Sequence, residues 1–279
     1  MQVPSDPGRF VQEIDEAVQS TAREQDAAER RLEQIQLAGE VWRRVQRDVP
    51  AGHYADALIA ITTTGDPPVV LEGSHPRRAL AQQLRDYLEP KSREATSRFE
   101  RDFPALARSH GIELDRTSRH PHYTLMQRFI RVDVDERRCT VTILPRDGTP
   151  AIIGADAALA ADRLAAEIRR ITERPFDADG LARSLHTAYD AVLRAERRPD
   201  GDEVPLRRVT ARLAKNLNRF AGDEFNYDLA RLVRRGKTVV AGKRLHLNHT
   251  RNARQGMLLH GMEEGGYVGF LSFKRDDER

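Results

Sequence analysis

Two segments, Phe129-Ile-Arg-Val-Asp-Val134 and Cys139-Thr-Val-Thr-Ile-Leu144, carry the clearest β pattern in this sequence. Apolar and polar residues alternate along both, and four polar residues, 135–138, separate them. Alternate side chains of a strand point to opposite faces, so Ile130, Val132 and Val134 are expected to face a core and the charged residues between them to face water. The pattern predicts a β-hairpin over residues 129–144.

Helical periodicity dominates the chain after this hairpin. Apolar residues recur at three- and four-residue steps in four expected helices, at 156–172, 177–197, 205–218 and 226–234. Asp156 is the expected N-cap of the first. Four β-like segments follow, at 238–240, 245–248, 257–260 and 267–273, with a turn at 263–266 before the last. Three helices followed by a β-hairpin is the order of a winged helix-turn-helix, in which 226–234 is the recognition helix.

A heptad-like pattern marks the N-terminal segment, from about Phe10 to Val49. Eight of twelve positions at alternating steps of three and four are apolar, and charged or polar residues lie between them. A helix of about 40 residues is roughly 60 Å long, so it needs a surface to pack on. Either it lies on its own domain, or it binds another chain, a protein partner or a second copy. The expected partner-binding side chains are Val11, Ile14, Val18, Leu32, Ile35 and Trp42.

The stretch between this helix and the hairpin is less regular. Val69–Leu71 is expected to be a short strand. A periodic run over residues 80–88 and a further helix over 91–108 follow, and Pro104 is expected to kink or interrupt the second.

The composition excludes several protein classes. Uninterrupted apolar runs stop at about five residues, whereas a membrane-spanning helix needs about 20. The single cysteine, Cys139, is expected to be buried, and it excludes an internal disulfide framework and a cysteine-based zinc site. No secretory signal is visible, so a cytoplasmic location is expected.

Positive charge is concentrated in residues 204–255. This block holds thirteen basic and three acidic residues, a net charge of +10, whereas the whole chain carries +3. A segregated basic block indicates a polyanionic partner, and Arg and Lys contact phosphates without reading sequence. An acidic protein partner, or a solvated face with no binding role, are the alternatives. The expected nucleic-acid-binding residues are Arg207, Arg208, Arg212, Lys215, Arg231, Arg234, Arg235, Lys237, Lys243, Arg244, Arg251 and Arg254.

No catalytic or nucleotide-binding motif is recognisable. The glycine-containing segments lack the Lys-Ser/Thr of a P-loop and the strand–helix context of a dinucleotide site, so no enzyme activity, cofactor or metal is expected. One alternative is a metal-dependent hydrolase or nuclease, because imidazole and carboxylate groups gather around the hairpin. Its candidate residues are His120, His122, Asp133 and Asp135.

The sequence therefore predicts an α+β, mainly helical protein in three parts. Residues 1–50 form a coiled-coil-like helix, 51–150 a small α+β domain with the hairpin, and 151–279 a basic, winged-helix-like domain with C-terminal strands. The expected function is that of a non-enzymatic accessory subunit. It assembles through its N-terminal helix and contacts nucleic-acid backbone through the basic domain, in a DNA-maintenance or bacterial defence complex. A protein-binding scaffold with an acidic partner is the other non-enzymatic alternative.

Overall fold

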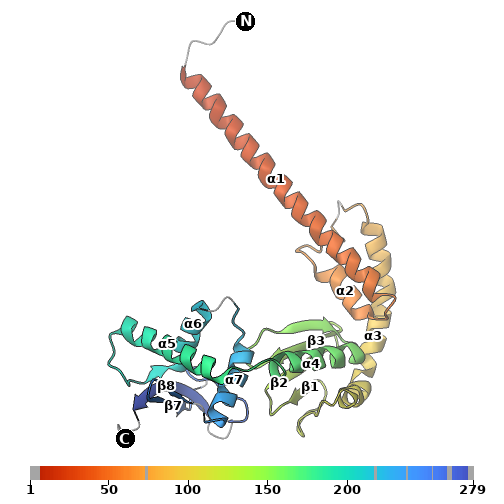
Figure 1. The fold of residues 1–279 in the computed structure, drawn as a ribbon. Helices are drawn as coiled ribbons and strands as arrows, with labels where there is room; N and C mark the ends of the chain where they lie inside the picture. The colour runs from red at the N-terminus through yellow and green to blue at the C-terminus, as the bar shows by residue number, and fades with distance from the viewer. Residues whose placement is uncertain are drawn as a thin grey trace. The chain divides into compact units, whose positions relative to one another are not determined.

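The computed structural model describes residues 7–72, 75–216, 219–236, 238–252, 254–262 and 266–275 (Figure 1). It is an α+β protein with antiparallel sheets and a long N-terminal helix. The chain divides into two compact units, residues 1–96 and 97–279, and each is described by itself. None of the described helices is long and apolar enough to cross a membrane.

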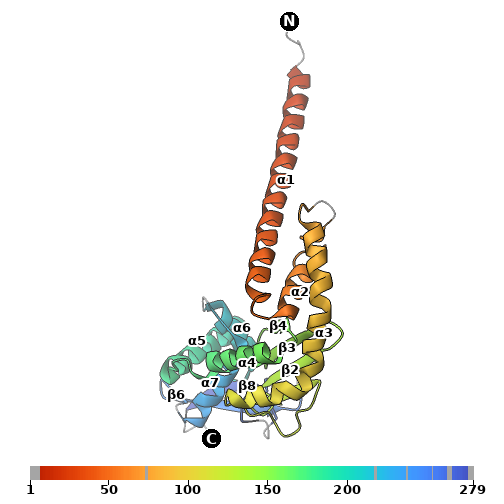
Figure 2. The same cartoon turned by 90° about the vertical axis from the view of Figure 1, so that its right-hand side faces the viewer.

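The first unit contains α1 (Pro7–Asp48), α2 (Tyr54–Thr63) and the first part of α3 (Arg78–Ser109). Helix α2 packs beside the C-terminal end of α1 (Figure 2). Val41 and Val45 of α1 are buried there against Ala57 and Ile61 of α2, four residues of a continuous apolar cluster. The predicted N-terminal helix is confirmed, with bounds within three residues of those expected.

One local prediction in this region is wrong. Val69–Leu71 forms turns, and Val69 and Val70 are buried in the cluster of the first unit without pairing as a strand. Of the two effects expected of Pro104, a kink or an interruption, the interruption does not occur, because helix α3 continues through this residue. The missing N–H of a proline costs one backbone hydrogen bond. Burial of Phe99 and Phe103, stacked at 4.8 Å between ring centroids, offsets that loss on the preceding turn.

The second unit begins with a four-stranded antiparallel sheet in the order β1-β2-β3-β4. Its strands are β1 (His122–Leu125), β2 (Ile130–Asp135), β3 (Thr140–Pro145) and β4 (Ala151–Gly154). The predicted hairpin is β2–β3, where Val132 pairs with Ile143 and both are fully buried. Helix α4 (Ala157–Thr172) covers one face of this sheet (Figure 1). Asp156 caps α4 as predicted, since its carboxylate accepts a hydrogen bond from the Leu159 N–H.

The rest of the second unit alternates helices with a second sheet. Its elements are α5 (Ala178–Glu196), β5 (Val204–Pro205), α6 (Leu206–Asn216), α7 (Gly222–Arg234), β6 (Val239–Val240), β7 (Lys243–Thr250) and β8 (Tyr267–Arg275). The strand order is β5-β8-β7-β6, so β5, which lies between α5 and α6 in sequence, pairs with the last strand.

The predicted elements of this region match the observed ones with two exceptions. Helix α7 begins at Gly222, four residues earlier than expected. Segment 257–260, an expected strand, makes only a single bridge between Met257 and Val268, on the edge of β8 where β5 pairs with Phe270 and Leu271. Of the expected turn at 263–266, residues 263–265 lie outside the described residues.

Tyr123 of β1 gives the fold a testable dependence on alkaline pH. Its ring is buried against Phe103, 5.0 Å between centroids, and burial raises the pKa of its phenol to about 12. The unfolded chain loses this proton near pH 10, so the folded state is stabilised below pH 10 and loses that contribution as the pH rises towards 12. Between pH 9 and 11.5 we expect the free energy of unfolding of Tyr123→Phe to fall by about 2 kcal/mol less than that of the unmodified chain, measured by urea unfolding.

The control is Tyr87→Phe, because the Tyr87 side chain is half exposed. Tyr189, whose pKa burial also raises, is retained in both variants and contributes equally to them. Identical pH slopes for Tyr123→Phe and the unmodified chain would contradict the prediction.

Candidate nucleic-acid interface

Helix α6 presents a basic stripe to solvent. Arg208, Arg212 and Lys215 lie at positions i, i+4 and i+7, which share one face of a helix, and all three are exposed. The opposite face, with Leu206, Val209 and Leu213, is buried in the core. Arg208 forms an ion pair with Glu196 of α5. Within the described part of the chain, no acidic side chain pairs with Arg212 or Lys215, so the charges of both are directed at solvent.

A second basic group forms where strands β7 and β8 meet. Cross-strand pairing places Arg244 opposite Lys274, and Lys243 opposite Arg275. Lys243 is engaged already, since its Nζ lies 2.5 Å from Asp200 Oδ2 and this hydrogen bond lowers the pKa of Asp200. Sequence reasoning omitted Lys274 and Arg275, because the register that brings them beside β7 is a tertiary feature.

The remaining predicted cations separate into exposed and engaged side chains. Arg251 and Arg254 are exposed in the connection between β7 and β8. Arg207 is exposed at the start of α6, where its guanidinium donates to the Gly256 carbonyl at 2.8 Å. Arg219, which the site prediction left out, is exposed after α6. Lys237 lies outside the described residues.

The basic side chains at the C-terminal end of α7 make contacts with other groups of the same chain. The Arg231 guanidinium stacks over the Phe176 ring at 4.4 Å and lies 3.7 Å from Asp228. Arg235 approaches the same ring at 5.1 Å, and Arg234 donates to the Ala230 carbonyl within its own helix. Arg231 is thus held by cation–π and ionic contacts inside the protein, whereas Arg234 and Arg235 keep exposed side chains.

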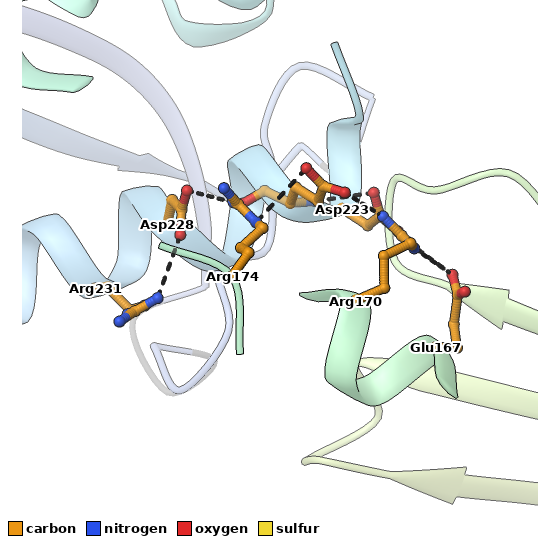
Figure 3. Close-up of polar contacts among 7 residues, drawn as sticks. Glu167, Arg170, Arg174, Asp223, Asp228 and Arg231 are labelled. Atoms are coloured by element: carbon orange, nitrogen blue, oxygen red, sulfur yellow. Dashed lines mark hydrogen bonds and ion pairs between the residues drawn. The ribbon is translucent and has the colours of Figure 1, made fainter. Parts of the chain in front are cut away.

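The first turns of α7 carry an ion-pair network with α4 and the segment after it (Figure 3). Arg170 pairs with Glu167, Asp223 and Glu224, and its Nη1 lies 2.5 Å from Glu224 Oε1. The hydrogen bonds to Glu167 and Asp223 raise the pKa of Arg170 well above its ordinary value. Asp223 is 2% exposed, so its carboxylate is desolvated and depends on Arg170 for its charge partner.

Arg174, which follows the end of α4, extends the network to the next turn of α7 (Figure 3). It pairs with Asp228, lies 3.5 Å from a carboxylate oxygen of Glu224, and donates to the Glu224 backbone carbonyl at 2.9 Å. Burial raises the pKa of Asp228, and the charge of Arg174 opposes that rise. Together these contacts occupy the acidic residues of the helix predicted to read bases.

Asn226 completes the attachment of α7 to the rest of the unit. It is fully buried and donates to Asp147 Oδ2 at 2.8 Å and to the Leu258 carbonyl at 3.0 Å. Its own oxygen accepts from the His260 N–H at 3.1 Å. The N-terminal half of α7 is therefore directed at its own chain, and it reaches a DNA groove only if these contacts break.

The residues of the alternative metal site do not converge. His120 Nε2 lies 2.7 Å from Glu136, whereas His122 Nδ1 lies 2.9 Å from Asp133. Asp133 also accepts from Arg131 at 2.6 Å, and Asp135 accepts the backbone N–H groups of the hairpin turn. In the described ranges, no group of three His, Cys, Asp or Glu side chains could hold a metal ion. Cys139 is buried, as predicted.

The expected partner-binding face of α1 is open within its unit. Every described side chain from Phe10 to Gln36 is exposed. Of the six predicted residues, Val11, Ile14, Val18, Leu32 and Ile35 are 57–62% exposed. The sixth, Trp42, is partly covered and lies 6.5 Å from His75 between ring centroids.

Comparison of the chain with protein-family models, with curated proteins and with solved structures found no match.

The Arg170 network predicts a stability effect that separates it from the exposed arginines. Arg170→Ala leaves the buried Asp223 carboxylate without its charge partner, and we expect a loss of about 2–4 kcal/mol in the free energy of unfolding. Urea denaturation of the full chain measures this loss. Arg169→Ala is the matched control, since Arg169 is an exposed neighbour on the same helix. Equal losses in the two variants would contradict the assigned role.

Proposed function

We propose that this chain is a non-enzymatic accessory subunit that contacts nucleic-acid backbone through α6 and the β7–β8 hairpin, and that assembles with a protein partner through α1. The observation that carries the nucleic-acid half is the exposed stripe of α6. A helix face with Arg and Lys one turn apart matches the spacing at which side chains reach successive phosphates, and it supplies affinity without base readout.

The topology supports the same proposal. The second unit has three helices, a short strand between the first two, and a terminal hairpin that pairs with this strand, an order that a winged helix-turn-helix would also have. In such a fold the hairpin connection is a wing, and here Arg251 and Arg254 lie in that connection. The proposed contact differs from the usual docking mode, because the first turns of α7 pair with α4.

Backbone contact is therefore favoured over sequence recognition. Base readout requires side chains at the start of a recognition helix to reach the major groove. At that position α7 carries Asp223 and Glu224, and both are bound to Arg170. Acidic side chains also repel phosphates. We propose that α6 and the hairpin bind along the duplex exterior, in a complex for DNA maintenance or defence whose catalytic partner is another chain.

A protein-binding scaffold is the second candidate, favoured by the exposed apolar side chains of α1. In that case an acidic protein surface binds the α6 stripe. Duplex binding separates the two candidates.

The proposal predicts salt-dependent duplex binding that weakens when the α6 stripe is neutralised. We expect Arg212→Ala/Lys215→Ala to weaken binding of a labelled duplex equally for unrelated sequences, because phosphate contacts carry no sequence information. The slope of log K against log salt falls by about two, because each removed cation leaves one phosphate with its counterion. Fluorescence anisotropy at several salt concentrations measures both quantities.

The control is Arg93→Ala/Arg101→Ala, which removes the same charge from exposed positions of α3. An equal loss in the control would assign the binding to net charge alone. No duplex binding by the unmodified chain at low salt would overturn the nucleic-acid half and favour an acidic protein partner.

A further inference from the structure

The exposed part of α1 carries an apolar seam with a defined period. In heptad notation Val11, Val18 and Leu32 occupy a positions, and Ile14 and Ile35 occupy d positions, and all five are more than half exposed. A single helix of this length in water gains its stability from packing its apolar face, and α2 covers only the C-terminal end of α1. The seam therefore requires a partner of matching period.

A groove beside the seam lies where α1 meets the chain that follows α2. Its volume is about 870 Å³, and its lining includes Ile35, Ala38, Trp42, Val69 and His75. Three arginines, Arg30, Arg31 and Arg77, and one acidic residue, Glu72, also line it. The groove thus combines an apolar floor with positive charge, and it suits the end of an amphipathic helix that carries acidic residues. The N-terminal part of α1 itself has this character, with Glu13, Asp15 and Glu16 beside Val11 and Ile14.

Like charges disfavour two of the ways in which two copies of α1 can pair. In a parallel dimer the flanking g and e residues face each other, which sets Glu24 against Glu29 of the partner subunit in two symmetric contacts. An antiparallel dimer with Val11 opposite the partner's Ile35 sets Asp15 against the partner's Glu29. It also sets the two copies of Glu24 against each other. Like charges at these positions destabilise both arrangements.

One antiparallel register avoids these repulsions and pairs opposite charges. With Val11 opposite Trp42 of the partner subunit, Glu24 faces Arg31 of the partner subunit in two symmetric contacts. Val18 then packs on the partner's Ile35, and Ile14 lies against the partner's Gly39, where a missing side chain leaves room for it. The overlap covers about 32 residues, roughly 48 Å of helix. Shorter antiparallel overlaps leave either Ile35 or Val11 uncovered.

We infer that the partner of α1 is a second copy of this chain, bound antiparallel, with the N-terminal end of each α1 in the groove beside Trp42 of the partner subunit. This inference rests on the assembly half of the proposed function and names its partner. The opposed charges of Glu24 and Arg31 set the register, while the seam and the groove supply the apolar contact.

The direct test measures the register by disulfide trapping of the full chain. In a Cys139→Ser background, Val18→Cys and Ile35→Cys are made as separate variants, one of them carrying a tag, and mixed under mild oxidation. We expect a crosslink between the two variants and none within Val18→Cys alone. A mixture of Val11→Cys and Ile35→Cys controls for the rejected register and is expected to stay uncrosslinked. Crosslinking within Val18→Cys alone, or in the control mixture, would overturn the inferred arrangement.

A series of charge-swap variants tests the orientation independently, because Glu24→Arg changes the dimer affinity in opposite directions for antiparallel and parallel pairing of α1. Sedimentation of the unmodified chain is expected to show a dimer of the 31.6 kDa subunit. Glu24→Arg or Arg31→Glu alone is expected to weaken dimerisation about 5- to 10-fold, and the Glu24→Arg/Arg31→Glu double variant to restore it. In a parallel dimer Glu24→Arg would instead strengthen the pairing, because it would face Glu29 of the partner subunit.

The outcomes also separate this inference from the proposed function. A monomer at every concentration overturns the self-pairing and leaves the duplex titration as it was. Loss of duplex binding with an intact dimer overturns the nucleic-acid proposal alone.

Discussion

The burial of two carboxylates on α7 holds this helix against the rest of the second unit. Asp223 and Asp228 are 2% and 7% exposed, and charges leave water at an acceptable cost only when they are paired. Arg170 and Arg174 provide this pairing, together with backbone and side-chain bonds to the same helix. Helix α7 is thereby attached to α4. Asn226 attaches it also to the loop after β3, because its side chain donates a hydrogen bond to Asp147. Breaking either attachment would leave a charge or an amide unsatisfied in the interior.

The exposed positive charge of this unit lies elsewhere. With the first turns of α7 bound to their own chain, the exposed basic side chains include the α6 stripe and Arg244, which lies opposite Lys274 in the sheet. The exposed side chains of Arg212 and Lys215 are long and lie in water, so their attraction for a polyanion is screened by salt and insensitive to sequence.

The first unit contributes an apolar surface of a different kind. The seam of α1 has the spacing of a coiled coil, and charges beside it distinguish one pairing from the others. A two-fold assembly would carry two basic surfaces on one particle. Where a single duplex spans both, the second contact becomes intramolecular and the effective affinity rises without any new residue.

Sequence alone determined the features that depend on neighbours within a few residues. Alternation predicted the hairpin at 129–144, cap chemistry predicted the start of α4 at Asp156, and heptad spacing predicted the extent of α1. It could not determine contacts between distant segments, because these depend on how whole elements pack. The pairing of β5 with β8, the meeting of Arg244 with Lys274, and the bond of Arg170 to Asp223, 53 residues away, are of this kind. The continuity of α3 through Pro104 is another, since the packing of Phe99 and Phe103 overrides a local preference. Charge counting found the basic block, but only tertiary structure decided that Arg231 and Lys243 support the fold while Arg212 and Lys215 face water.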